Sequence, residues 1–274
     1  MNKLHVRYHS LDNRLHFKRM ESDPVEIPFD IHNRWELIYL KSGEVTYTVN
    51  GKAYQLREDW LIITRSLNSH SILCTGKEPY DRYVVQFEEA DISSDICEIF
   101  PQNLDVLYCG AEGGIREVFE KIAQYVQMFE EKTVRIMVLH LIEEILCDAK
   151  LLIDRSKDKY ESPCNTTVAQ AVEYIKENIY RPVRVEEVAE QLFVSAGHLH
   201  YLFMQYMQVP PKQYITTLKL TLAYRVLCNG QKATRVCTKY GFPDYSGFYR
   251  QYLRYFGHKP SEAEAYQKNL GTHH

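Results

Sequence analysis

The stretch that decides the fold is VEEVAEQLFVSAGHLHYLFMQYMQVPPK, residues 185–212, which returns in altered form as ATRVCTKYGFPDYSGFYRQYLRYFGHKP, residues 233–260. A repeat of this kind is interpreted before any single motif, because it sets the architecture. With one extra residue in the second copy, the corresponding pairs are Val188 and Val236, Ala189 and Cys237, Leu192 and Tyr240, Val194 and Phe242, Leu199 and Phe248, Phe203 and Tyr252, Gln208 and Gly257, and Pro211 and Pro260.

Each copy predicts a short amphipathic helix, a tight turn and a second amphipathic helix. Apolar residues recur at spacings of three and four on both sides of the turn. Ser195 and Asp244 stand where the second helices need N-caps, and Gly241 supplies a turn residue for which a positive φ is cheap. The pattern is typical of a helix-turn-helix, whose second helix enters the DNA major groove.

Residues 211–228 predict one long helix between the two copies. An apolar stripe runs along it from Tyr214 to Val226, and Asn229-Gly230 provides a stop. A rigid helix there would hold two recognition helices on one face of a duplex, about 34 Å apart.

The polar outer faces of the second helices supply the predicted DNA contacts. Arg250 is the first choice for a base contact, since arginine pairs bidentately with guanine. No Lys or Arg lies between Ser195 and Gln208, so the first copy either reads by shape and apolar contact or scarcely contacts DNA. The further candidates are Gly197, His200, Tyr201, Tyr245, Ser246 and Tyr249 for the grooves, and Arg225, Lys239 and Arg254 for phosphates.

Residues 165–274 resemble the DNA-binding domain of AraC/XylS-type transcriptional regulators. The matches are Val188-Ala189, Ser195, His198-Leu199, Leu202-Phe203, Gly241-Phe242, Phe248, Arg250, Phe256-Gly257 and Pro260-Ser261. The departures are Gln208 where the family has Gly, Tyr201 where it has Arg, Cys237 where it has Ala, and Glu264 near a usual Arg. The resemblance implies a sequence-specific DNA-binding regulator, commonly an activator that responds to a sugar or related metabolite, with RNA polymerase as a further candidate partner.

Charge is distributed unevenly along the chain. The formal net charge is -3, but residues 165–274 carry 13 Lys and Arg against 8 Asp and Glu, whereas residues 1–164 carry 20 against 28. This asymmetry fits a nucleic-acid-binding C-terminal half joined to an acidic sensor.

The N-terminal half has a β pattern after a polar arm and a short entry strand in residues 1–30. Alternation from His32 onward is broken at Ser42-Gly43 and at Asn50-Gly51, the strongest hairpin signal. Residues 60–63 and 83–87 are further strand-like runs. The sequence therefore predicts an α+β chain with an N-terminal antiparallel barrel or jelly roll and an all-α C-terminal domain.

Residues 30–90 resemble the cupin-like sensor half of the same family. His32, Glu36 and Gly43 match the first cupin motif and His70 the second, but Arg34 stands at the place of a second motif histidine. His32, Glu36 and His70 could form a facial triad for a metal; we favour a small-molecule pocket with no metal and no cofactor. The candidate effector-binding residues are Arg34, Trp35, Glu36, Tyr39, Tyr47, Arg65 and His70.

Two apolar stripes within residues 113–153 predict an antiparallel helical hairpin. Such a pair buries its stripe against the barrel or against a second subunit, and the family resemblance favours partial use in a homodimer. We therefore expect an effector-binding and dimerisation domain at residues 1–153, a polar linker at 154–164, and a DNA-binding domain at 165–274.

The remaining features concern compartment and catalysis. The seven cysteines form no CxxC motif, and the chain shows neither a signal peptide nor an apolar run of membrane-spanning length, so we expect a reduced, cytoplasmic protein. The competing hypothesis is a cupin metalloenzyme with a helical oligomerisation tail, although no nucleophile–base pair or phosphate-binding glycine loop supports it. The sequence does not identify the effector or the operator.

Overall fold

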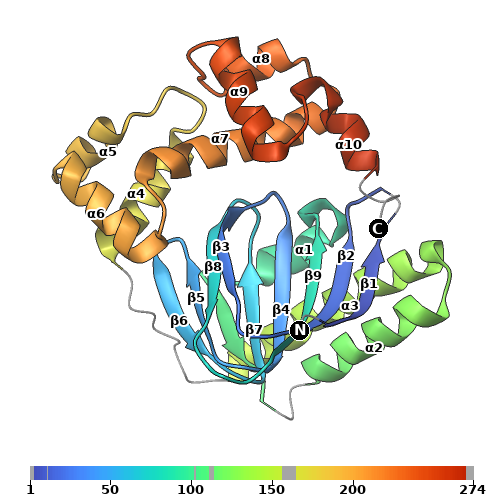
Figure 1. Ribbon diagram of the computed structural model, residues 1–274. Helices are drawn as coiled ribbons and strands as arrows, with labels where there is room; N and C mark the ends of the chain where they lie inside the picture. Colours follow the sequence, from blue (N-terminus) through green and yellow to red (C-terminus); the bar gives the residue numbers. More distant parts are fainter. Residues whose placement is uncertain (1–2, 11, 102, 111–113, 156–164, 270–274) are drawn as a thin grey trace.

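Two antiparallel sheets form the N-terminal half of the computed structural model, which describes residues 3–10, 12–101, 103–110, 114–155 and 165–269. The larger sheet has the strand order β1 (Lys3–His9), β2 (His16–Ser22), β9 (Tyr80–Phe87), β4 (Trp35–Ser42), β7 (Trp60–Thr64) and β10 (Val106–Tyr108). The smaller sheet has the order β3 (Glu26–Ile31), β8 (Ser69–Cys74), β5 (Val45–Val49) and β6 (Lys52–Leu56). The fold is α+β and cupin-like, as predicted (Figure 1).

The sheets face each other across an apolar core. Ile38 of β4, Tyr47 of β5 and Ile72 of β8 belong to this cluster and are almost wholly buried. The predicted Asn-Gly hairpin joins β5 to β6, with Asn50 at φ 46° and Gly51 at φ 82°. A turn with two left-handed residues matches the twist of the strands it connects, which explains why this dipeptide appears there.

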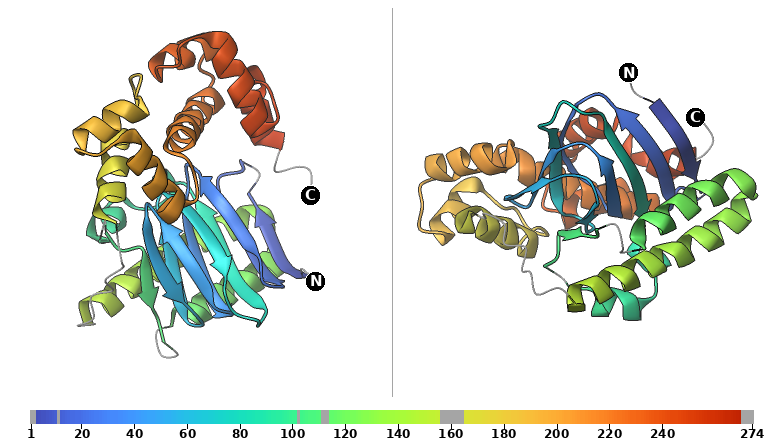
Figure 2. Two further views of the ribbon diagram at one scale, coloured as in Figure 1. Left: turned by 60° about the vertical axis from the view of Figure 1, so that its left-hand side comes forward. Right: turned by 90° about the horizontal axis from the view of Figure 1, so that it is seen from below.

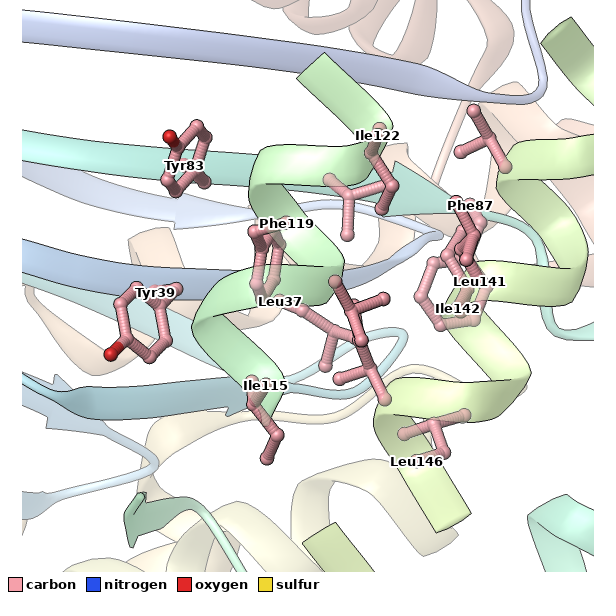
Figure 3. Packing of buried hydrophobic residues seen from close by; sticks show 14 of the residues in the cluster. Leu37, Tyr39, Tyr83, Phe87, Ile115, Phe119, Ile122, Leu141, Ile142 and Leu146 are labelled. Carbon is pink, nitrogen blue, oxygen red and sulfur yellow. The ribbon is translucent and has the colours of Figure 1, made fainter. Parts of the chain in front are cut away.

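A helical hairpin covers the other face of the larger sheet (Figure 3). It consists of α2 (Ile115–Met128) and α3 (Glu131–Arg155), close to the predicted bounds, and the short helices η1 (Glu89–Asp91) and α1 (Ser94–Ile99) precede it. Phe119 of α2 packs on the rings of Tyr39 and Tyr83, with centroids 5.7 Å away in both cases. The central strands β9, β4 and β7 are therefore buried on both faces.

The prediction of a polar arm and one short entry strand for the first thirty residues was wrong. β1 and β2 form a hairpin that pairs with β9 at the edge of the larger sheet, and β3 then opens the smaller one. Leu15 and Phe17 are buried and belong to the core under the helical hairpin. Histidines and charged residues between the few apolar positions hide the alternation in the sequence.

The C-terminal half is all helical, as predicted. Its helices are α4 (Thr166–Glu177), α5 (Val185–Gln191), α6 (Ala196–Met207), α7 (Pro211–Cys228), α8 (Ala233–Lys239), α9 (Tyr245–Phe256), η2 (Pro260–Glu262) and α10 (Ala263–Asn269). The long helix α7 connects the two helix-turn-helix units, α5–α6 and α8–α9, and stops at Asn229 with Gly230 at φ 77°.

The helical domain lies across one end of the two sheets (Figures 1 and 2). Thr221 Oγ1 of α7 donates to the carbonyl of Ile31 at 3.1 Å, and Lys176 Nζ donates to Asn68 Oδ1 at 2.8 Å. Ile31 of β3 packs into the apolar core of the helical domain. Most of the predicted linker, residues 156–164, lies outside the described residues.

Candidate nucleic-acid interface and ligand pocket

The recognition helices begin as the sequence predicts. The Ser195 side chain accepts a hydrogen bond from the amide of His198 at 3.1 Å, and the Asp244 side chain accepts one from the amide of Gly247 at 2.6 Å. Each cap satisfies an amide that the first helical turn leaves without a partner. Gly241, with φ +63°, makes the turn of the second unit.

The predicted groove-reading residues lie on the surface of α6 and α9. The inner faces bury Leu199, Phe203, Phe248 and Tyr252, which leaves the opposite faces open. Tyr201 keeps 58% of its surface exposed. Exposed with it are Gly197, His200, Tyr245, Ser246 and Arg250, while Tyr249 is half-buried. This arrangement permits groove contact by both helices, and the individual contacts stay predictions.

A buried lysine joins the two units. Lys219 of α7 donates from Nζ to the carbonyl of Arg181, ahead of α5, at 2.8 Å and more weakly to that of Gly241, in the second turn, at 3.5 Å. A Cβ at Gly241 would come within 2.6 Å of the Arg181 carbonyl carbon and 2.7 Å of the Pro182 nitrogen. The second turn therefore packs directly on the chain that leads into the first unit.

The two units differ in charge. In the second unit Lys239 of α8 and Arg254 of α9 are exposed, as is Arg250, and their phosphate contacts stay predictions. In the first unit α5 exposes Glu186 and Glu190 instead. Arg225, predicted as a phosphate contact, faces the cupin half, where its Nη1 lies 3.4 Å from Asn33 Oδ1.

Four of the predicted effector-binding residues have packing roles in the structure. Trp35 and Tyr39 point from β4 into the core beneath the helices, and Tyr39 donates to Asp59 at 2.6 Å. Tyr47 is buried between the sheets, 2.8 Å from the Thr64 hydroxyl. Arg65 spans to the carbonyls of Leu104 and Pro101. Alternate residues of a strand point to opposite faces, and on β4 both faces are buried.

Glu36, His70 and His32 form a buried imidazole–carboxylate cluster. Glu36 lies 3.4 Å from His70 Nε2 and 4.0 Å from His32 Nε2, and Gln86 donates to it at 2.5 Å. Burial alone would lower the pKa of His70 and raise that of Glu36. The hydrogen bond and charge between them outweigh burial, so the pKa of His70 is raised and that of Glu36 falls to about 2. Burial lowers the pKa of His32, which stays neutral.

The cluster partly satisfies the requirements of a metal site. Asp30, His32 and His70 offer ligand atoms within 4.8 Å of one another. Each imidazole Nδ1 faces a backbone carbonyl, of Arg34 at 3.0 Å and of Asn68 at 3.3 Å, which leaves Nε2 for another partner. The residue at the place of the second motif histidine, Arg34, points elsewhere, and Glu36 is occupied by His70 and Gln86. The residues therefore fit an ion pair better than a metal.

A pocket of about 470 Å³ opens between the cupin half and the helical domain. Of the predicted effector-binding residues, Arg34 lines it. From the sheets come Arg7, His9, Asn13, His16, Asp30, Ile31, His32, Asn33, Gln86 and Glu88, and from the helices Thr221, Tyr224, Arg225, Cys228, Asn229, Tyr255, Phe256, His258, Tyr266 and Gln267. Sequence reasoning missed these residues because it looked for the site inside the sheets, whose interior is filled by side chains.

Comparison with known proteins gives two family matches that follow the two halves. Residues 188–265 match a helix-turn-helix domain, and residues 18–85 match a cupin domain. This is the domain pair of the AraC/XylS-type regulators, which the chain resembles in both halves. It is 24% identical over 213 residues to the HTH-type transcriptional regulator YfiF of Bacillus subtilis, covering 72% of this chain and 65% of that one.

One further relative and one solved structure align with both halves of the chain. The lactose operon transcription activator of Staphylococcus xylosus is 18% identical over 236 residues and covers 85% of both chains. Among solved structures, ToxT of Vibrio cholerae aligns over 95% of this chain and 99% of that chain, with a TM-score of 0.41 and 13% identity. None of the described helices of this regulator is long and apolar enough to cross a membrane.

Proposed function

We propose that this AraC/XylS-type regulator binds specific double-stranded DNA through α6 and α9 and activates transcription in response to a small molecule. The observation that carries the proposal is the pair of capped helix-turn-helix units with open recognition faces, held together by α7. The eighteen residues of α7 extend about 27 Å at the rise of an α-helix, close to one turn of a DNA duplex. The basic side chains of the second unit supply the larger share of phosphate attraction.

The interdomain pocket provides a route from effector to DNA. Its walls come from both domains, so a molecule bound there contacts the cupin half and α7 together. A ligand shifts a conformational equilibrium only when it binds one arrangement better than another. A site between two domains meets that condition directly, because a change in domain docking changes the site itself.

The helical hairpin is the proposed homodimer contact. Met128 and Ile136 expose 70% and 53% of their surfaces on α2 and α3, and Phe129 and Leu151 are also exposed. These side chains lie on the surface that the larger sheet does not cover. Sedimentation of the full chain tests the contact: Ile136→Lys should convert a dimer to a monomer, whereas Lys77→Glu, in the exposed loop between β8 and β9, should not.

Selection of binding sites from a random duplex pool tests the DNA-binding proposal. We expect the full chain to enrich one sequence and to protect two adjacent major-groove segments in a footprint. Arg250→Ala should then cost about 1–3 kcal/mol on the selected site and relax specificity at one position. Arg116→Ala, an exposed arginine on α2, is the matched control and should change nothing. A chain that enriches no sequence at low salt would refute the proposal.

A second role for the first unit is favoured by Phe193. This side chain is 96% exposed at the turn before α6 and has φ +56°, a conformation that the equivalent Gly241 adopts more easily. An exposed aromatic side chain in a neutral-to-acidic unit suits a protein partner such as RNA polymerase better than a phosphate backbone. A footprint of one major-groove segment, unchanged by His200→Ala, would support this role.

A further inference from the structure

Lys219 places one buried cation at the junction of the two helix-turn-helix units. It lies in the middle of α7 and exposes only 5% of its surface. Its Nζ donates to the Arg181 carbonyl at 2.8 Å and more weakly to the Gly241 carbonyl at 3.5 Å. The first carbonyl belongs to the chain that enters α5, and the second belongs to the turn between α8 and α9. One ammonium group thus contacts the backbone of both units.

Backbone dipoles hold this ammonium group in place. Among the described residues no carboxylate forms an ion pair with Lys219, and burial, followed by the charge of Arg181, lowers its pKa. A buried ammonium group has lost its hydration and depends on the acceptors that the fold supplies. Hydrogen bonds from a cation to a carbonyl are stronger than those between neutral groups. A movement of either carbonyl away from Nζ would therefore cost free energy, so the lysine resists a change in the distance between them.

The Arg181 carbonyl is tied to the first unit. Arg181 Nε donates to Asn178 Oδ1 at the end of α4 at 3.0 Å. Its Nη2 donates to the hydroxyl of Tyr174 at 3.1 Å and to Glu187 of α5. The side chain of Arg181 thus fixes its own backbone against both helices that flank it.

The Gly241 carbonyl is tied to the second unit in a similar way. The Gly241 amide donates to the Thr238 carbonyl of α8 at 3.1 Å. The residues immediately before the two carbonyls, Tyr180 and Tyr240, pack ring on ring with centroids 5.6 Å apart. This aromatic contact joins the same two chain segments as Lys219 does.

We propose that Lys219 is a positioning residue that sets the spacing between the two major-groove segments of the DNA site. It acts through the carbonyls of Arg181 and Gly241 and, being buried, does not contact DNA itself. The inference rests on the proposed function and adds a determinant of the DNA site that lies in neither recognition helix.

The test measures the affinity of the full chain for three duplexes, which are the selected site and two sites with one base pair inserted or removed between the segments. One base pair moves the second segment by about 3.4 Å along the duplex and by about 35° around it. We expect the wild type to bind the altered sites roughly tenfold or more weakly, because one unit loses its contacts. Lys219→Met keeps the side-chain length but removes the donors, and should reduce this ratio to about threefold or less.

Three further variants separate spacing from stability. Lys219→Arg keeps a cation with several donors and should keep the wild-type ratio. Leu222→Ala removes a buried side chain of the same helix that has no donor, and should weaken binding to the three duplexes alike. If circular dichroism shows that Lys219→Met does not fold, Lys219→Gln takes its place, since its amide donor has a shorter reach and should also narrow the ratio.

The outcomes distinguish this inference from the proposed function. The inference alone is overturned if the donor-deficient variant keeps the wild-type ratio, if Leu222→Ala narrows the ratio equally, or if the wild type binds the three spacings equally well. A wild-type chain that selects no DNA sequence would refute the proposed function and, with it, the role of Lys219 in spacing.

Discussion

Replacing Gln208 by glycine should stabilise the protein. Gln208 ends α6 in the left-handed conformation, with φ 56° and ψ 21°, and its side chain is exposed. Gly257 ends α9 at the equivalent place with φ 75° and ψ -1°, and a Cβ added there would meet nothing within 4 Å. Substitutions at the two positions therefore test the energetic cost of a left-handed backbone without a contribution from side-chain packing.

The magnitude follows from two opposing terms. A non-glycine residue in the left-handed region costs roughly 1–2 kcal/mol, and glycine loses about 0.5–1 kcal/mol more backbone entropy on folding. Gln208→Gly should therefore raise the free energy of unfolding by about 0.5–1 kcal/mol, and Gly257→Ala should lower it by about as much. A change of this size moves the melting temperature of a chain this long by about 2–4 °C.

Urea and thermal unfolding of the full chain, followed by far-ultraviolet circular dichroism, measure both changes. Gln205→Gly is the matched control, because Gln205 is equally exposed but lies within α6, where glycine should destabilise by up to about 1 kcal/mol. If Gln208→Gly destabilises the protein as much as Gln205→Gly does, backbone conformation does not govern the end of α6 and the reasoning fails.

Three further predictions concern a close backbone contact, a buried lysine and a buried ion pair. Gly241→Ala should destabilise by more than 2 kcal/mol, since its Cβ would overlap the Arg181 carbonyl, and a melting curve within 2 °C of the wild type would contradict the close contact. Burial lowers the pKa of Lys176 to about 8, so the unfolded chain binds more protons between pH 8 and 10; stability should rise across that window by about 1 kcal/mol and stay flat in Lys176→Met, as urea unfolding would show. Because His70 and Glu36 pair with each other, we expect elemental analysis of purified protein to find no stoichiometric transition metal, and one bound metal per chain that His70→Gln removes would overturn this assignment.

Local signals explain why the C-terminal half could be predicted. The caps at Ser195 and Asp244 and the glycine turn at Gly241 act over three or four residues, and the repeat shows the cap in both copies. The helical hairpin was predictable for a related reason, because its apolar stripes are long and follow the helical period.

The ligand site could not be found in this way. Its arginines come from β1, from the residue before β4 and from α7, and its aromatic residues come from α7, α9 and α10, so no single window of sequence contains it. The alternation of side chains along β4 gave no help either, because this central strand is covered on both faces and buries apolar side chains on each of them. Trp35 and Tyr39 are therefore of residue types that are common in ligand pockets, although both lie in the core beneath the helices.

The position of the pocket on α7 has a mechanical consequence. The same helix presents Lys219 to the carbonyls of both helix-turn-helix units and, two residues later, Thr221 to the cupin half. Arg225, one turn further on, faces the pocket. Since packed helices shift as rigid bodies more readily than they bend, a ligand that moves α7 against the sheets moves both units together and keeps their spacing. The effector would then change where the pair of units is presented, and the spacing of the DNA site would be the same with and without ligand.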